Sequence, residues 1–77
     1  MTMALTYRQL RHIMGYSVMD VAKSGFMNYT TYRQIDNGTS KPENVTMKSF
    51  LQICDAYNIH PANALEMLYD VPPKDED

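Results

Sequence analysis

Apolar residues recur three and four positions apart along most of this chain, and they never alternate with polar residues over the length of a strand. The clearest case is the segment 47–57, whose apolar side chains are Met47, Phe50, Leu51, Cys54 and Tyr57. Spacings of three and four place side chains on one face of an α-helix, whereas a strand repeats every two residues. The pattern therefore predicts an all-α fold.

Capping and stop residues divide the chain into five expected helices. Residues suited to begin a helix are Thr6, Ser17, Asn28, Thr46 and the pair His60-Pro61. Residues suited to end one are Gly15, the break Ser24-Gly25-Phe26, Gly38 and Asn58. Besides the face of 47–57, we expect these side chains to point inward: Tyr7, Leu10, Met14, Val18, Val21, Ala22, Met27, Tyr32, Ile35, Leu65, Met67 and Leu68.

The expected domain spans residues 1–69 and is followed by a short tail. The chain has 77 residues, which suffices for one small domain. Residues 70–77 read DVPPKDED, and such a proline-rich, acidic segment has too little apolar surface to pack. We therefore expect a disordered acidic tail over 70–77.

From the sequence we do not expect a membrane protein, a metal or cofactor site, or an enzyme. No stretch reaches the roughly 20 apolar residues of a membrane span, and no basic region precedes an apolar run at the N-terminus, so a cytoplasmic protein without a membrane contact is predicted. The single cysteine, Cys54, is expected to be a buried and inert thiol. His12 and His60 have no partners at metal-ligand spacing, so no metal and no cofactor are predicted. No nucleophile comes with a base, and no enzyme is expected.

The charge is distributed unevenly, although the net charge is only −2. Residues 1–41 hold five basic and two acidic residues, whereas residues 42–77 hold two basic and seven acidic ones. The first half is therefore moderately basic, which permits contact with a nucleic acid but does not identify one.

The expected helix 28–36 lies in this basic half and carries an unusual set of side chains. Its sequence, NYTTYRQID, has two threonines, two tyrosines, an arginine and a glutamine. A helix that serves only a core needs one apolar stripe and covers the remainder with solvated charges. This helix instead exposes uncharged hydrogen-bonding groups, which is typical of a surface that recognises another molecule.

Two short helices joined by a tight turn, the second of them polar, are the parts of a helix-turn-helix. At this point the sequence resembles the XRE family of Cro and lambda-repressor-like helix-turn-helix proteins over residues 7–68. The matching residues follow in the family's order: Leu10-Arg11, Gly15-Tyr16-Ser17, Val21-Ala22, Ile35-Asp36-Asn37-Gly38, Lys41-Pro42 and the helix from Phe50 to Tyr57.

The resemblance implies that helix 28–36 enters the major groove of double-stranded DNA, where each base pair presents a distinct donor and acceptor pattern. The positions that match the family's base-reading residues are Tyr29, Thr30 and Gln34, with Asn28 at the helix start. The residues placed to hold phosphates are Arg33, Asn37, Thr39, Ser40 and Lys41. Arg11 and Asp36 match a structural ion pair that ties the first helix to the end of the third.

The resemblance also implies a small Cro-type transcription regulator that binds an inverted-repeat operator as a dimer. The residues expected to form the dimer contact are Tyr69, Val71 and Met67, the last of which also suits a core position. Two positions depart from the family: Val18 replaces a phosphate-binding glutamine, and Phe26 replaces the glycine of the turn. These two residues, together with an exposed Met19, favour an alternative, an antirepressor or modulator that binds a partner repressor.

Overall fold

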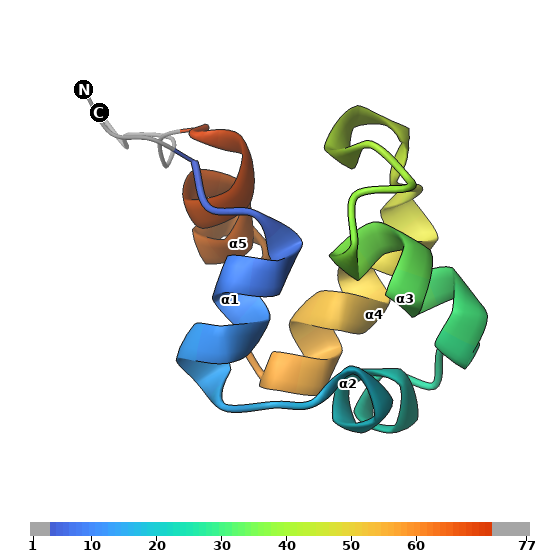
Figure 1. Ribbon diagram of the computed structural model, residues 1–77. Coiled ribbons are helices and arrows are strands. Elements are labelled where there is room, and N and C mark those ends of the chain that lie inside the picture. Colours follow the sequence, from blue (N-terminus) through green and yellow to red (C-terminus); the bar gives the residue numbers. More distant parts are fainter. Residues whose placement is uncertain (1–3, 72–77) are drawn as a thin grey trace, which may run out of the picture.

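The computed structural model describes residues 4–71, which form five α-helices, one short 3-10 helix and no strand (Figure 1). The helices are α1 (Tyr7–Met14), α2 (Val18–Ser24), α3 (Tyr29–Asp36), η1 (Pro42–Asn44), α4 (Met47–Tyr57) and α5 (Pro61–Tyr69). The predicted all-α fold of five α-helices is confirmed. The 3-10 helix η1 was expected only as a loop. Residues 72–77 of the expected tail lie outside the described range.

The helices begin where the sequence supplies capping side chains. Thr6 and Ser17 each accept a hydrogen bond from the third residue of their helix, whose own side chain, Gln9 or Asp20, accepts from the cap N–H. These reciprocal bonds satisfy two backbone donors that the helix itself leaves unpaired. At the other end of the domain, Asn58 takes the left-handed conformation expected of a residue that stops a helix, with a φ of 57°.

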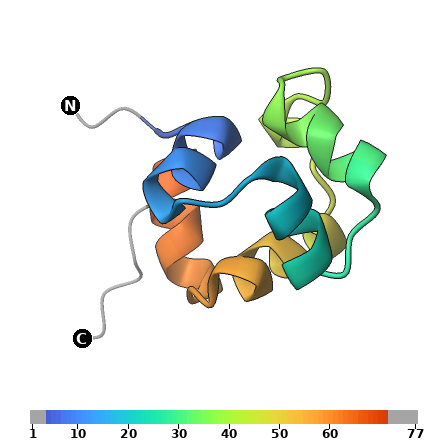
Figure 2. The ribbon, with the colours of Figure 1, turned by 60° about the horizontal axis from the view of Figure 1, so that its bottom comes forward.

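Helix α4 crosses the middle of the molecule, with α1 and α5 on one side and α3 on the other (Figure 1). Helix α2 packs against both α3 and α4 (Figure 2). The most deeply buried large side chains are Tyr32, Leu10, Ile53 and Val21, which come from four different helices. One core therefore holds α1 to α4 together and fixes the position of α3.

The inward face of α4 differs from the expected one. Met47 is 68% exposed, and Leu51 also lies at the surface, whereas Ile53 is buried. The buried stripe runs through Phe50, Ile53, Cys54 and Tyr57, which keeps the helical spacing but is rotated away from Leu51. Met47 stands at the first residue of the helix, one turn beyond this stripe, and the prediction that it fills the core is wrong.

The inward face of α5 also needs a correction. Leu68 is buried as predicted, but Leu65 is exposed and Ala64 takes the inward position beside it. Met67 is partly buried and packs against the core, as its predicted inward position requires and contrary to its expected exposure in a dimer contact. Tyr69, which was expected to be exposed, is also partly buried and packs against the core. The Tyr69 hydroxyl donates to the Pro42 carbonyl at 2.7 Å and shares a hydrogen bond with the Tyr7 hydroxyl at 2.6 Å. These polar contacts hold the ring inward, which hydrophobic spacing alone does not predict.

Within residues 4–71 no helix has both the length and the apolar character needed to cross a membrane.

Candidate functional site

Helix α3 has one buried face and one exposed polar face. Tyr32, Ile35 and Asp36 are buried, while Tyr29, Thr30, Arg33 and Gln34 are exposed. Residues 29, 30, 33, 34 and 37 follow the three- and four-residue spacing of one helix face. The structure thus brings together on one side of α3 three of the predicted base readers, Tyr29, Thr30 and Gln34. Two of the predicted phosphate-binding residues, Arg33 and Asn37, lie on the same side.

The polar groups on this face are not occupied by the protein. Within the described residues, the side chains of Tyr29, Thr30, Arg33 and Gln34 form no hydrogen bond with another residue. Asn28 differs, because its Oδ1 accepts from the Thr30 N–H at 2.9 Å and from the Thr31 N–H at 3.3 Å. The oxygen of Asn28 therefore caps the helix, and only its amide NH₂ is left to bind another molecule.

The segment after α3 is ordered by its own hydrogen bonds. The Asn37 side-chain oxygen accepts from the Thr39 N–H at 2.9 Å, and the Ser40 N–H donates to the Gln34 carbonyl at 2.9 Å. Thr39 and Lys41 are exposed, and Ser40 is half-buried. The expected phosphate-binding residues thus lie on a fixed backbone beside the end of α3.

The contact between Arg11 and Asp36 joins α1 to α3. Arg11 Nε lies 2.7 Å from Asp36 Oδ1, and a second guanidinium nitrogen lies 3.4 Å from Oδ2. Another nitrogen of Arg11 donates to the Tyr16 carbonyl at 2.9 Å, so this side chain is held from two sides. Asp36 is only 7% exposed. The two charges therefore fix the C-terminal end of α3 against α1.

The charges around Asp36 also set its protonation. Burial raises the pKa of the Asp36 carboxyl, but hydrogen bonds from Arg11 and Arg8 and the charge of Arg11 outweigh it, so the net pKa lies below the ordinary value. Hydrogen bonding to Asp36 raises the pKa of Arg11. Both groups are therefore charged at neutral pH.

Sequence reasoning missed two partners of Asp36. Arg8 Nε lies 3.3 Å from Asp36 Oδ2, and the hydroxyl of the buried Tyr32 donates to Oδ1 at 3.2 Å. Their spacing is a usable signal, because Arg8 lies three residues before Arg11 and Tyr32 lies four before Asp36, which puts each pair on one helix face. The result is a carboxylate with four donor contacts from three side chains.

The turn between α2 and α3 is built differently from the expectation for a glycine turn. Gly25 has a φ of −94°, which any residue can adopt, whereas Phe26 takes the left-handed conformation with a φ of 56°. Gly25 is required for space, because a Cβ there would lie 2.6 Å from the Gln52 carbonyl oxygen of α4. Phe26 itself is 85% exposed. The turn therefore combines close backbone packing with a strained residue at the surface.

The three apolar residues that favoured a protein partner, Val18, Met19 and Phe26, differ in how exposed they are. Met19 and Phe26 are exposed, as the partner surface requires. Val18 is partly buried and packs against the core. Val18 therefore has a structural role, and only Met19 and Phe26 are available to another molecule.

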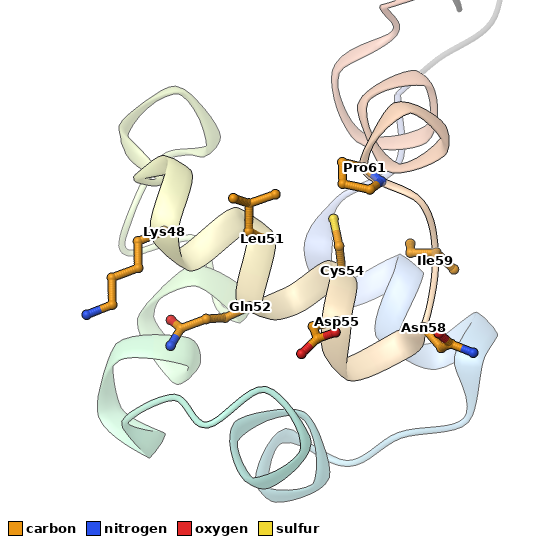
Figure 3. Close-up of a pocket in the computed structure, with 8 residues that line it drawn as sticks. All are labelled: Lys48, Leu51, Gln52, Cys54, Asp55, Asn58, Ile59 and Pro61. Atoms are coloured by element: carbon orange, nitrogen blue, oxygen red, sulfur yellow. The ribbon is translucent and has the colours of Figure 1, made fainter.

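One surface groove lies on the outer side of α4 and has no residue of α3 in its lining. It has a volume of about 500 Å³, and Figure 3 shows Lys48 and Asn58 pointing outward near its two ends. Cys54 lies in this groove but is 3% exposed, and burial raises the pKa of its thiol. Across residues 4–71, no three His, Cys, Asp or Glu side chains are grouped so that they could hold a metal ion. The exposed face of α3 thus remains the candidate site.

Comparisons of the chain with models of protein families, with curated proteins and with solved structures gave no match. The candidate site is therefore defined by the side chains of α3 and the residues that hold this helix in place.

Proposed function

We propose that this protein is a small sequence-specific DNA-binding transcription regulator that reads the major groove with α3. The observation that carries the proposal is the exposed face of α3, where Tyr29, Thr30 and Gln34 present polar groups that no other residue of the described chain occupies. An α-helix with its side chains is about 10–12 Å wide, and the major groove is about 12 Å wide. In this assignment α2, the turn and α3 form a helix-turn-helix.

The proposed contacts follow from the chemistry of each side chain. Gln34 pairs bidentately with adenine, Thr30 contacts a thymine methyl or a polar base edge, and Tyr29 offers a ring edge and a hydroxyl. Arg33 and Lys41 bind phosphates, which fix the position of the helix but carry no sequence information. The contact of Arg11 with Asp36 supports this arrangement, because it orients α3 relative to the remainder of the domain.

A single α3 reads only a few base pairs, so the proposed active form is a symmetric dimer on an inverted-repeat operator, with two copies of α3 about 34 Å apart. Exposed apolar side chains supply a surface for this contact. Met47, Leu65 and Val71 border an apolar groove of about 330 Å³ between α4 and α5. This surface keeps Tyr69 and Val71 of the contact expected from the sequence, because both line the groove, and replaces Met67, which packs against the core, with Met47 and Leu65.

Two threonines on the same helix allow a matched test. Thr30 lies on the proposed reading face, whereas Thr31 lines a groove shared with Lys48 and Gln52 of α4. We select bound sequences from a random duplex library with the purified protein and then titrate the Thr30→Ala, Thr31→Ala and Gln34→Ala variants. Thr30→Ala and Gln34→Ala are expected to lose about 1–3 kcal/mol at one base position each, and Thr31→Ala little. Equal DNA affinities of Thr30→Ala and Thr31→Ala would contradict the proposal that the face of α3 with Thr30 reads the bases.

A second candidate function is binding to a partner repressor, which the exposure of Phe26 and Met19 favours. Exposed aromatic and methionine side chains are typical of protein interfaces. Under this function, Met19→Asp and Phe26→Asp disrupt the complex by burying an unpaired charge, while Gln34→Ala leaves it intact. Circular dichroism must first show that both aspartate variants are folded. Unchanged partner binding by both variants excludes this second function at this surface.

A further inference from the structure

A smaller groove is lined by residues from the start of α1, from the end of α3 and from the segment that follows α3. It has a volume of about 290 Å³. Its lining includes the largely apolar side chains Tyr7, Ile35 and Pro42 and the polar side chains Arg8, Asn37 and Ser40. Asp36 also lines it, with a carboxylate that is buried and already bonded to Arg11 and Arg8. The groove therefore offers an apolar floor with hydrogen-bond donors around it.

Arg8 brings a positive charge to this groove that the protein does not fully neutralise. The nearest carboxylate, Asp36, is already held by Arg11 at 2.7 Å, while Arg8 contacts it only through Nε at 3.3 Å. Two arginines thus share one acid, which leaves a net positive charge. The Arg8 side chain is 53% exposed, and in the described part of the chain its terminal nitrogens form no hydrogen bond. Asp36 thus positions Arg8 and leaves its two terminal nitrogens free to bind an anion.

Asn37 and Ser40 add neutral donors beside Arg8. Because the Asn37 oxygen accepts from the Thr39 N–H, the amide is fixed and its NH₂ group is the part left to donate. Ser40 donates its backbone N–H to Gln34 and keeps its hydroxyl free within the described residues. A guanidinium, an amide and a hydroxyl around one groove match the oxygens of a phosphate.

We propose that this groove binds one deoxyribose-phosphate unit of a DNA strand, with Arg8 as a phosphate-binding residue. The inference rests on the proposed DNA-binding function and adds a contact that the family resemblance did not supply. The phosphate lies against Arg8, Asn37 and Ser40, and the apolar carbons of the sugar lie over Tyr7, Ile35 and Pro42. A free inorganic phosphate would not use the apolar floor, so a nucleotide backbone fits the groove better.

The position of Asn37 connects this groove to the reading face. Asn37 follows directly on α3 at the spacing of its exposed face, and it also lines the groove. A DNA strand whose bases meet Gln34 therefore has its sugar-phosphate backbone directed toward Arg8. Arg8 in turn contacts Asp36, the last residue of α3. Phosphate binding at Arg8 thus holds the end of the reading helix in position on the DNA.

The test measures DNA affinity against salt concentration for the wild-type protein and three variants. Arg8→Gln is expected to weaken binding by roughly tenfold, the loss of one charged hydrogen bond, and to make the salt dependence shallower by about one unit while base preference is unchanged. Arg8→Lys restores the salt dependence because it keeps the charge. Lys23→Gln is the control, since Lys23 is exposed in the last turn of α2 and carries the same charge. A wild-type salt slope in Arg8→Gln overturns the inference.

A second measurement locates the contact on the DNA. A neutral methylphosphonate is placed at each backbone position of the selected duplex in turn. At one backbone position the methylphosphonate should weaken DNA binding by the wild-type protein but should not weaken DNA binding by Arg8→Gln any further. Equal weakening of both proteins at every position overturns the inference. If the wild-type protein shows no salt-dependent DNA binding at all, both the proposed DNA-binding function and the phosphate contact at Arg8 are wrong. If the wild-type protein binds DNA but Arg8→Gln keeps the wild-type salt dependence, only the contact at Arg8 is wrong.

Discussion

The two ends of α3 are held in place by different kinds of interaction. The C-terminal end is fixed by charged hydrogen bonds to a single side chain, Asp36. The turn that leads into the N-terminal end is fixed by the close approach of two backbones at Gly25, the C-cap of α2. The same helix therefore depends at one end on the presence of a side chain and at the other on the absence of one.

At the C-terminal end, Arg11, Arg8 and the Tyr32 hydroxyl all contact the Asp36 carboxylate, which has a side chain only 3% exposed. A buried ion pair contributes little net stability against an apolar replacement, but removal of one partner leaves an uncompensated charge. This end is therefore sensitive to single changes in charge.

At the N-terminal end, α2 passes so close to α4 that Gly25 has no room for a Cβ, and the next residue takes a left-handed conformation. The Gln52 side chain donates to the Phe26 carbonyl at 3.2 Å and closes the contact. Charge has no part in this packing. The N-terminal end should thus respond to added volume and to backbone strain, but not to pH.

The largest expected effect is at the charged end. Arg11→Met should destabilise the domain by about 3–5 kcal/mol, because Asp36 is left buried with weaker partners. Urea unfolding followed by circular dichroism measures this loss. Arg33→Met is the matched control on the exposed face of α3, and it should stay within about 0.5 kcal/mol. A double-mutant cycle with Asp36→Asn that shows no coupling contradicts the role of the pair.

The next largest effect is expected at Gly25, where the backbone packs closely against α4. Gly25→Ala should destabilise the domain by about 1–3 kcal/mol, because the new Cβ meets backbone atoms of α4 that cannot rotate away. Gly38→Ala is the control: its φ of 86° carries strain, but no atom lies within 4 Å of the added Cβ. Thermal unfolding of the two variants compares the stability lost to added side-chain volume at Gly25 with the stability lost to backbone strain at Gly38. A larger loss for Gly38→Ala would mean that α2 can move away from α4.

The sequence was sufficient to predict the five α-helices and most of their ends, because these features are local. Thr6, Ser17, Asn28, Thr46 and Asn58 each act on backbone groups within a few residues. The side of each helix that faces inward depends on its neighbours in space. For this reason Met47, Leu65 and Tyr69 were placed wrongly, although the apolar spacing around them was recognised.

The candidate site was predictable to the same degree. The grouping of Tyr29, Thr30 and Gln34 on one face follows from helix geometry alone. Arg8 was missed because its role depends on a contact with Asp36 across 28 positions of the chain. The need for Gly25 was likewise hidden, because the atom that excludes a side chain belongs to Gln52, far along the sequence.

The two ends of α3 should also differ in how their contribution to the free energy of unfolding changes with pH. This change is expected to be a fraction of the loss caused by Arg11→Met. The folded pKa of Asp36 is lowered, so its stabilising contribution is complete above the unfolded carboxyl pKa of about 3.9 and is lost as the pH falls through the folded value. The difference in unfolding free energy between wild type and Asp36→Asn should be constant from about pH 5 to 7 and shrink below about pH 4. Gly25→Ala should show a constant difference over the whole range, and a difference that varies for both variants would remove the contrast.

The smallest expected effect is a gain in stability at the strained residue. Phe26 has a φ of 56° and an almost fully exposed ring, so its replacement loses little packing. Asparagine adopts the left-handed region more readily, and Phe26→Asn should therefore stabilise the domain by about 0.5–1 kcal/mol in urea unfolding. Because the change lies off the exposed face of α3, the proposed DNA-binding function predicts that it leaves DNA affinity unchanged. A stabilised variant that has lost a protein partner would assign the strain at Phe26 to partner binding, whereas a destabilised variant would show that the ring packs more than its exposure indicates.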